Sequence, residues 1–261
     1  MSGKIRSDIR LITAYCLPLT AYRLPLTAHR LLFTFSMLSI IIPCLNEGEG
    51  IAGTLAALAP LRERGAEAIV VDGDSRDGTA ERAAPWVDAV IMAQRGRAAQ
   101  MNAGAARARG EILLFLHADS LLPDAADALI IEGLARTRRG WGRFDVTIAG
   151  RHPLLRVVER LMNLRSRLTG IATGDQAIFV TKSLFLAAGG YPEIALMEDV
   201  ALCKRLKRFG PPLCLKHRLT TSGRRWEKHG VLCTILLMWR LRLAFWLGAD
   251  PGKLALRYDR G

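Results

Sequence analysis

The chain has 261 residues, half of them hydrophobic and only 7% aromatic, which suits one large α/β domain and disfavours two independent domains. Its five cysteines include no CxxC pair and no histidine pair at zinc-finger spacing, which argues against a disulfide framework or structural zinc and favours a reduced, cytoplasmic compartment. The net charge of +13 is concentrated in residues 201–261, which contain 14 Lys and Arg against 3 Asp and Glu. A basic surface is therefore predicted in this segment. It could bind nucleic acid, an anionic bilayer or a phosphorylated substrate, or it could simply face solvent.

The first 36 residues differ in kind from the rest. The heptapeptide L-P-L-T-A-Y-R at 17–23 is repeated directly as L-P-L-T-A-H-R at 24–30, a duplication typical of low complexity. There is neither an apolar run of the roughly 18 residues that a spanning helix needs nor a signal-peptide cleavage site. We interpret 1–36 as a disordered extension or as sequence upstream of a true start at Met37, followed by a main domain over 37–230 and a basic amphipathic helix and tail over 231–261.

Short apolar, β-branched runs alternate with helical patterns in the first part of the main domain. The first run, L-S-I-I-I-P, ends in a proline, as a buried parallel strand does. Such alternation predicts right-handed βαβ units in a parallel sheet. The predicted strands cover 38–43, 67–72, 88–92 and 111–119, and the predicted helices cover 48–64, 78–84 and 98–109.

The second half is less regular. Residues 141–150 alternate as in an antiparallel strand, and 176–181 predict a further strand. Residues 154–168 predict an amphipathic helix, and 198–209 predict a helix that begins with two acids, which the positive end of its dipole favours. The whole pattern predicts an α/β fold with a mostly parallel central sheet.

Polar residues follow the predicted strands where each strand ends. Ligands bind at the carboxyl ends of parallel strands, so these residues are site candidates. Asp77 is well placed to cap the following helix, and its role is predicted to be structural. Asp72 has no capping duty; besides ending a strand in solvent, it could accept a hydrogen bond from the imide N–H of a uracil-like base. The candidates are Asn46, Glu47, Asp72, Arg95, Arg97, His117 and Asp119.

His117 and Asp119 form the tripeptide H-A-D after the fourth strand. A carboxylate at the mouth of a buried strand suits a hard cation such as Mg²⁺ or Mn²⁺ that also binds a diphosphate. Alternatively, the tripeptide begins the next loop and Asp119 caps a helix after Pro123. Arg95 and Arg97 flank a glycine before a helix, where they could contact a diphosphate or base edge or form a solvated basic turn.

Glu198 and Asp199 open the last predicted helix of the main domain. A carboxylate in this place could deprotonate a substrate hydroxyl group. Compensation of the helix dipole explains two acids at a helix start without any chemistry, and the pair taken alone favours that interpretation.

Taken together, seven short motifs in this order resemble the family 2 inverting glycosyltransferases, from Leu38 to about Trp226. The resemblance implies a GT-A fold, a UDP- or GDP-linked sugar donor, a divalent cation (Mn²⁺ or Mg²⁺) and a small-molecule or lipid-linked acceptor. The H-A-D, G-D-Q and E-D-V set also resembles a small bacterial subgroup associated with arsenosugar biosynthesis. The motifs are P-x-L-N-E (43–47), V-D-G-D-S-R-D-G-T (71–79), R-G-R-A-A-Q-M-N-A-G (95–104), H-A-D (117–119), G-D-Q (174–176), G-G-Y (189–191) and M-E-D-V (197–200).

The resemblance also implies roles for individual residues. Asp199 would be the general base, with Glu198 free to orient the acceptor or cap the helix. Asp119 would hold the metal. His117 replaces the first acid of the usual Asp-x-Asp motif, the acid that normally contacts the ribose, and an imidazole can join a Mn²⁺ site. The nucleoside would lie against Pro43, Asp72 and one of Asn46 and Glu47. Arg97 would lie near the base or the phosphates, and Arg225 and Trp226 would contact the diphosphate. Asp175 and Gln176 would face the donor sugar or the acceptor.

Three other functions fit parts of the sequence. A nucleotidyltransferase would need a basic Gly-rich loop after the first strand, where C-L-N-E-G-E-G is acidic. A nucleic-acid-binding protein would explain the charge but not the acids at the strand ends, which repel phosphates, so no nucleic-acid partner is predicted. An inactive sugar-nucleotide sensor is motivated by His117 alone.

Residues 231–247 are strongly apolar but contain Arg240 and Arg242 and fall short of the roughly 20 residues that a span requires. They predict an interfacial helix, which would place the chain on the inner face of the cell membrane. The alternative is a helix that packs on the domain core. The arginines that could add a second basic face are Arg156, Arg160, Arg165 and Arg167.

Overall fold

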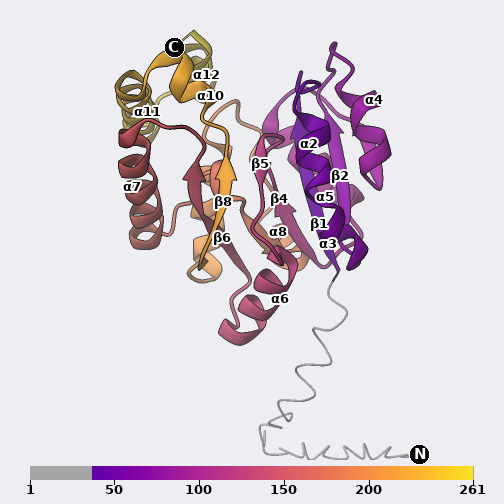
Figure 1. Ribbon diagram of the computed structural model, residues 1–261. Helices are drawn as coiled ribbons and strands as arrows, with labels where there is room; N and C mark the ends of the chain where they lie inside the picture. Colours follow the sequence, from indigo (N-terminus) through magenta and orange to yellow (C-terminus); the bar gives the residue numbers. More distant parts are fainter. Residues whose placement is uncertain (1–36, 261) are drawn as a thin grey trace, which may run out of the picture.

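The computed structural model describes residues 37–260, except the side chains of His229, Asp259 and Arg260, so the predicted extension 1–36 lies outside the described residues. The chain folds into an α/β unit in which helices cover both faces of one eight-stranded sheet (Figure 1). Between residues 37 and 260, no helix is both long enough and apolar enough to cross a membrane.

The first four long strands are parallel neighbours, as predicted. They are β1 (Leu38–Cys44), β2 (Glu67–Asp72), β3 (Ala89–Met92) and β4 (Ile112–Phe115), in the spatial order β3-β2-β1-β4. Every residue of β2 and β4 is buried, which explains why β4 and the residues between Glu67 and Asp72 of β2 are continuous apolar runs rather than alternating ones. The strand predicted over 111–119 ends early, because the backbone turns after Phe115 and places His117 and Asp119 in a loop.

The second half extends the sheet in the order β7-β6-β8-β5. β7 (Phe179–Thr181) is antiparallel to β4 and to β6 (Trp141–Ile148), and β5 (Ser120–Leu121) is antiparallel to β8 (Leu213–Thr221). The antiparallel pairing predicted for 141–150 is therefore only part of the arrangement, since the longest pairing of β6 is parallel, with β8. A bulge opposite Phe144 and Asp145 interrupts that ladder.

The helices follow the predicted pattern with shifted boundaries. The helix predicted over 48–64 is two helices, because Pro60 begins a new first turn. The acidic pair opens α9 as predicted. The helices are α2 (Ile51–Ala56), α3 (Ala59–Glu63), α4 (Thr79–Ala83), α5 (Arg97–Arg107), α6 (Ala126–Thr137), α7 (Pro153–Thr169), α8 (Lys182–Ala187), α9 (Glu198–Leu206), α10 (Arg224–His229), α11 (Val231–Trp246) and α12 (Pro251–Arg260), with single 3₁₀ turns at η1 (Ala84–Trp86), η2 (Gly174–Gln176) and η3 (Lys207–Phe209).

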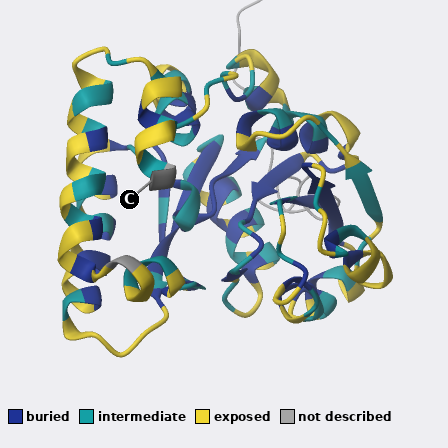
Figure 2. Ribbon diagram, turned by 90° about the horizontal axis from the view of Figure 1, so that it is seen from above, coloured by how far each residue is buried: buried dark blue, intermediate teal, exposed yellow. Residues whose placement is uncertain are grey.

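Two hydrophobic cores lie on opposite faces of the sheet. Ile40 and Ile42 of β1 pack into one core, whereas Ile41 packs into the other with Met101 of α5. Gly104 lets α5 approach closely, because a Cβ there would overlap the Ile41 side chain. Seen from above, the strands form the buried centre and the outer helices carry the exposed surface (Figure 2).

The C-terminal segment differs from the predicted basic amphipathic helix. Residues after 230 form two helices, α11 and α12, which pack on each other and on the start of α9 through Met197, Leu241 and Leu254. α11 carries apolar side chains on its packed face and also on its exposed face, because V-L-C-T-I-L-L-M-W has no polar stripe at the helical period. The helix is therefore apolar nearly all round rather than basic on one side.

Candidate active site

A cavity of about 540 Å³ lies where β1 and β4 end, and α10 to α12 contribute its far wall. The cavity brings together residues from both halves of the chain, as the motif order predicts. Four predicted site residues lie outside its wall: Asn46, Asp72, Gln176 and Asp199. The predicted residues within its wall are Pro43, Glu47, Arg95, Arg97, His117, Asp119, Asp175, Glu198, Arg225 and Trp226.

Asp72 ends β2 and is fully buried. Its Oδ1 accepts a hydrogen bond from the backbone N–H of Ser75 at 2.7 Å. Its Oδ2 is buried and has no hydrogen-bond partner among the described residues. Because a buried carboxylate oxygen without a donor is costly, this atom is suited to accept a hydrogen bond from a ligand.

Asn46 and Asp77 tie together the loops that follow β1 and β2. Asn46 has a positive φ of 54°, accepts a hydrogen bond from the Arg76 N–H at 3.0 Å and donates its own N–H to Ser75 Oγ at 2.9 Å. Asp77 accepts hydrogen bonds from the Gly48 N–H at 2.8 Å and from the first N–H of α4 at 3.1 Å. Asp77 is structural, as predicted, and Asn46 shapes the rim of the cavity rather than its wall.

The first turn of α5 presents Arg97 to the cavity and Gln100 to the sheet. Gln100 is buried, and its Nε2 donates to carbonyl groups of β1 and β2 at 2.8 Å each. Desolvation opposes the charge of Arg97, but the Tyr258 phenol, which ionises at high pH, and the carboxylates of Glu198, Asp175 and Asp199 outweigh that effect and raise its pKa. Arg97 is therefore a fixed positive charge facing the cavity.

Arg224, which no predicted role includes, forms ion pairs at the cavity. Its Nη2 lies 3.0 Å from Glu47 Oε2 and 3.6 Å from Asp119 Oδ2. The predicted Arg225 turns toward α12, where its Nη2 donates to the Tyr258 carbonyl at 2.6 Å and its guanidinium lies 3.6 Å from the Tyr258 ring centroid. Arg224 is thus the arginine beside the predicted metal carboxylate.

His117 lies against the G-D-Q segment. Its Nδ1 is 3.3 Å from Asp175 Oδ1, and its Nε2 faces the Cα of Gly174 so closely that a side chain there would collide with it. Burial raises the pKa of Asp175, but the His117 hydrogen bond and nearby cations outweigh it, and the net pKa is lowered. In the part of the chain that the structure describes, no group of three or more His, Cys, Asp or Glu side chains could hold a metal ion.

The Asp119 carboxylate nevertheless fits a divalent cation that a diphosphate shares, whereas both ring nitrogens of His117 face the G-D-Q segment and would have to turn to join it. Mg²⁺ commonly keeps one or two protein ligands, and phosphate oxygens and water complete its coordination. Asp119 retains 31% of its side-chain exposure and lines the cavity, so its carboxylate is accessible to an incoming ion. The donor set is therefore sufficient only together with a bound diphosphate.

Gln176 is not a cavity residue, contrary to its predicted role. It is fully buried, and its Nε2 donates to Asn163 Oδ1 at 3.3 Å and to Ser166 Oγ at 3.1 Å. Its Oε1 accepts from the Thr173 N–H, which completes a capping box around η2. Gln176 therefore fixes η2 to α7, and this places the neighbouring Asp175 in the cavity wall.

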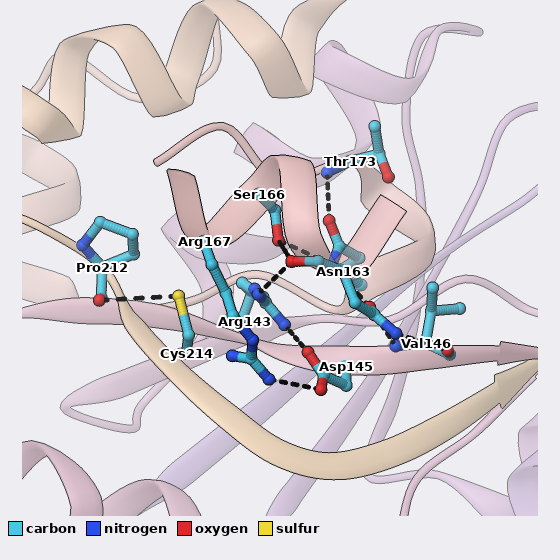
Figure 3. Close-up of polar contacts among 10 residues, drawn as sticks. Arg143, Asp145, Val146, Asn163, Ser166, Arg167, Thr173, Pro212 and Cys214 are labelled. Carbon is cyan, nitrogen blue, oxygen red and sulfur yellow. Dashed lines mark hydrogen bonds and ion pairs between the residues drawn. The ribbon is translucent and has the colours of Figure 1, made fainter. Parts of the chain in front are cut away.

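A buried polar network extends from this contact to β6 (Figure 3). The Asn163 side chain bonds both backbone groups of Val146, at 2.9 and 3.1 Å. The fully buried Arg143 pairs with Asp145, which also binds Arg167 at 2.5 Å. Because buried charges are tolerated only when paired, this network specifies the position of α7 on the sheet.

The acidic pair divides between two environments. Asp199 Oδ2 accepts the Gly174 N–H at 2.9 Å and its Oδ1 accepts the Val200 N–H at 2.6 Å, so both oxygens are held by backbone groups. Glu198 is buried in the cavity wall, where desolvation and then the charge of Asp199 raise its pKa to about 7. The preceding Met197 has a positive φ of 68°, a strained conformation of the kind that collects at functional sites.

Two further arginines, Arg165 of α7 and Arg242 of α11, lie near Asp199. Arg165 Nε and Nη2 are buried and have no hydrogen-bond partner among the described residues. Burial and then the charge of Arg242 lower the pKa of Arg165 to about 10. Met162 and Met238, one helical turn before these arginines, line the cavity, whereas the arginines themselves do not.

Comparison with known proteins places this cavity in a family context. The model of a family described as "Glycosyl transferase family 2" matches residues 39–180. Poly-beta-1,6-N-acetyl-D-glucosamine synthase of Staphylococcus epidermidis is 30% identical over 103 residues, which are 36% of this chain and 24% of that protein. The chain thus matches about a quarter of the length of this curated relative.

Solved structures share the fold at low sequence identity. The mannosyltransferase PcManGT of Pyrobaculum calidifontis, in complex with GDP-Man and Mn²⁺, has a TM-score of 0.55 at 23% identity over 79% of this chain and 60% of its own. TarS of S. aureus in complex with UDP has a TM-score of 0.58 at 20% identity over 71% and 60%. Glucosyl-3-phosphoglycerate synthase of Mycobacterium tuberculosis, with Mn²⁺ and UDP, has a TM-score of 0.51 at 21% identity over 74% and 72%. These likenesses identify a GT-A-like α/β fold.

Proposed function

The chain belongs to glycosyl transferase family 2 and is a glycosyltransferase, and we propose that it moves a sugar from a UDP- or GDP-linked donor to an acceptor hydroxyl with inversion. One observation carries this proposal: a single cavity joins Pro43 and Glu47 near the end of β1, Asp119 in the loop after β4 and Glu198 beside Asp199. Such a cavity can hold a nucleoside diphosphate and a second substrate together.

The nucleoside end is proposed to bind the base through Asp72 and Pro43. The unpartnered Oδ2 of Asp72 supports an imide donor such as that of uracil, although Asp72 itself lies just behind the cavity wall. Glu47 and the loop shaped by Asn46 would border the ribose. Similar proteins solved with UDP, UDP-GlcNAc or GDP-Man support a nucleotide-linked donor.

The diphosphate is proposed to lie between cationic side chains and a divalent ion. Asp119, with His117 beside it, would hold Mn²⁺ or Mg²⁺, which supplies charge neutralisation for the departing diphosphate when bound. Arg97 faces the same cavity, and Arg225 and Trp226 form its wall from α10. Arg224 would exchange its contacts with Glu47 and Asp119 for the diphosphate once the acidic groups bind donor and ion.

The transfer step requires a base on the face opposite the diphosphate. The acceptor oxygen forms its bond to the anomeric carbon as the carbon–oxygen bond to the diphosphate breaks, and the hydroxyl proton passes to a carboxylate. We assign this carboxylate to Asp199, with Asp175 and Glu198 orienting the acceptor. Glu198 is the alternative base, because it lines the cavity and its pKa near 7 suits proton transfer.

The acceptor is proposed to carry an anionic group, as a small molecule or on a lipid. The unpartnered Arg165 nitrogens and the nearby Arg242 lie close to Asp199 but outside the cavity wall, and they support a phosphate or carboxylate near this end only if it displaces the wall residues between. From the H-A-D, G-D-Q and E-D-V set alone, the subgroup associated with arsenosugar biosynthesis is also proposed, so an arsenical alcohol belongs in an acceptor panel. Absence of transfer to that alcohol, with transfer to another acceptor, would remove the subgroup assignment.

The chain is proposed to act in the cytoplasm at the inner face of the cell membrane. The predicted interfacial segment 231–247 corresponds to α11, whose exposed apolar side chains support this location.

A donor screen tests the proposed function directly. The purified full chain is incubated with Mn²⁺ and a panel of UDP- and GDP-sugars, and release of nucleoside diphosphate is measured. We expect one donor to be consumed faster than the others and faster than without metal. No release from any donor above the rate of an Asp119→Ala control, with any acceptor of the panel, would contradict the proposal.

A further inference from the structure

α7 has an apolar stripe on its outer face. The exposed side chains Val157, Leu161, Leu164 and Leu168 recur at intervals of four, three and four residues, and their exposed fractions lie between 47% and 77%. At 100° per residue they share one side of the helix, opposite the side that packs on β6 through Leu155, Val158 and Asn163. The outer stripe therefore has no role in holding α7 to the sheet.

α11 repeats this arrangement. Its exposed side chains Leu232, Leu236, Trp239, Leu243 and Trp246 follow the same helical spacing, with exposed fractions between 58% and 74%. The opposite side packs inward through Thr234 and Leu241. Nine of the sixteen large hydrophobic side chains that residues 37–260 expose lie in these two stripes, so the stripes form the main apolar surface of this part of the chain.

The two helices lie on one flank of the molecule. Figure 1 shows α7 and α11 together on the side of the sheet farthest from β2, with α11 above α7. Leu155 and Val158 of α7 pack in one cluster with Val231 and Ile235 of α11. The two stripes thus lie on neighbouring helices of one flank, which we call the α7–α11 flank and define by the nine stripe residues named above.

The charges of the α7–α11 flank have one sign. The only acid within α7 and α11 is Glu159, which is buried and bound to the Ile148 N–H at 2.6 Å. Arg160 and Arg240 are exposed beside the stripes. Exposed tryptophans among aliphatic and cationic side chains are typical of surfaces that lie in the headgroup region of a bilayer.

We propose that the α7–α11 flank is a docking surface for an anionic lipid bilayer. A second copy of the chain is a poorer occupant, because a two-fold contact would bring equal sets of arginines together without acids to pair them. Anionic headgroups supply the missing charges, and the acyl region accepts both stripes. The inner sides of the same helices contribute Met162, Thr234 and Met238 to the cavity wall, so docking would hold the acceptor end of the cavity close to the headgroups.

Vesicle sedimentation tests this surface independently of catalysis. The full chain is mixed with vesicles of phosphatidylcholine alone or of phosphatidylcholine with phosphatidylglycerol, and the pelleted fraction is measured. We expect recovery with the anionic vesicles and much less with the neutral ones, with the difference falling as salt is raised. Equal recovery in the supernatant for both vesicle types would overturn the proposal.

Matched variants assign the binding to the flank. The triple change Leu161→Ser, Leu236→Ser and Trp239→Ser should weaken binding by at least about tenfold, because each removed side chain contributes on the order of tenfold to partitioning. Arg160→Gln with Arg240→Gln should reduce the preference for anionic vesicles. Leu186→Ser, at a comparably exposed leucine of α8, is the control and should bind like the native chain.

Two results on these variants would overturn the assignment. One is equal binding by the triple variant and the control, with unchanged melting temperatures for both. The other is a native chain that sediments as a dimer without vesicles and a triple variant that is monomeric, since a second copy would then occupy the flank. Donor binding by the triple variant should remain native, so failure of the docking surface does not bear on the proposed sugar transfer.

Discussion

The two ends of the cavity are built in different ways. At the nucleoside end, short loops after β1 and β2 hold one another through Asn46, Ser75 and Asp77, so each side chain stays near its place in the sequence. At the acceptor end, α7, η2, α9 and α11 meet, and their positions depend on the buried network around Arg143 and Asn163. The nucleoside end is therefore a local product of strand and turn patterns, whereas the acceptor end is a product of tertiary packing.

The largest expected effect lies where the two ends meet. Asp119→Ala removes the carboxylate proposed to hold the metal and should abolish metal-dependent binding of UDP or GDP, while His117→Ala should be milder. Isothermal titration with the nucleotide and Mn²⁺ measures this, and the circular dichroism melting curve should be unchanged. If the Asp119 variant binds the nucleotide as tightly as the native chain does in the presence of Mn²⁺, Asp119 does not hold the metal.

Asp199→Asn tests the acceptor end alone. Asparagine keeps the volume and much of the hydrogen bonding to Gly174 but cannot take a proton, so kcat should fall by roughly 10²- to 10⁴-fold with donor affinity nearly unchanged. Glu198→Gln should cost less. If the Asp199 variant works at the native rate and the Glu198 variant does not, the base is the cavity-facing Glu198.

The pH dependence of stability examines the same acids without any substrate. The pKa of Glu198 is raised from 4.5 to about 7, so the folded chain binds more protons than the unfolded chain between these values. The free energy of unfolding should therefore fall as pH rises through this window, by at most about 3 kcal/mol for this group. Urea unfolding at several pH values should show that the free energy of unfolding falls less steeply with pH for Glu198→Gln than for the native chain. An identical pH dependence in the two proteins would show that Glu198 does not ionise in this pH window.

Asp72→Asn tests the nucleoside end and should have the smallest effect. If the oxygen of the new asparagine keeps the hydrogen bond from Ser75, the NH₂ group of the same side chain would face the imide N–H of uracil. These two groups are both donors, so the affinity for UDP should fall by about tenfold or more. UDP titration measures the loss, and GDP, whose guanine presents a different edge, is the comparison ligand. Equal UDP affinity in the native and variant chains would remove Asp72 from the base contact.

The same contrast explains what the sequence reveals. The strands β1 to β4 and the structural role of Asp77 follow from apolar runs and turn residues, and both are confirmed. The centre of β8 consists of the exposed residues Lys216, His217 and Arg218, and the bulge between β6 and β8 lies at this point. These three charged or polar residues break the alternation of apolar and polar side chains by which a strand is predicted. The existence of β8 depends on β6 as a partner, which local sequence does not encode.

Site residues divide along this line as well. The prediction that Gln176 faces substrate is wrong, because its side chain instead donates hydrogen bonds to α7 and so holds η2 against that helix. Arg165 and Arg242 carry no motif that would distinguish them from solvated arginines, and only the folded chain brings them near Asp199. Arg224 directly precedes the predicted Arg225 in the sequence, and only the folded chain shows that Arg224 is the arginine beside Asp119. The apolar content of 231–247 indicated a surface helix, but not that α7 would present a second stripe beside it.

The central claim is that this cavity catalyses an inverting sugar transfer. Proton NMR of the reaction mixture, recorded from the first minutes with the donor identified in the screen, follows the anomeric configuration of the product as it forms. We expect the first product to have the configuration opposite to that of the donor, with free nucleoside diphosphate appearing at the same rate. A first product that keeps the donor configuration would contradict direct displacement assisted by a carboxylate of the acidic pair.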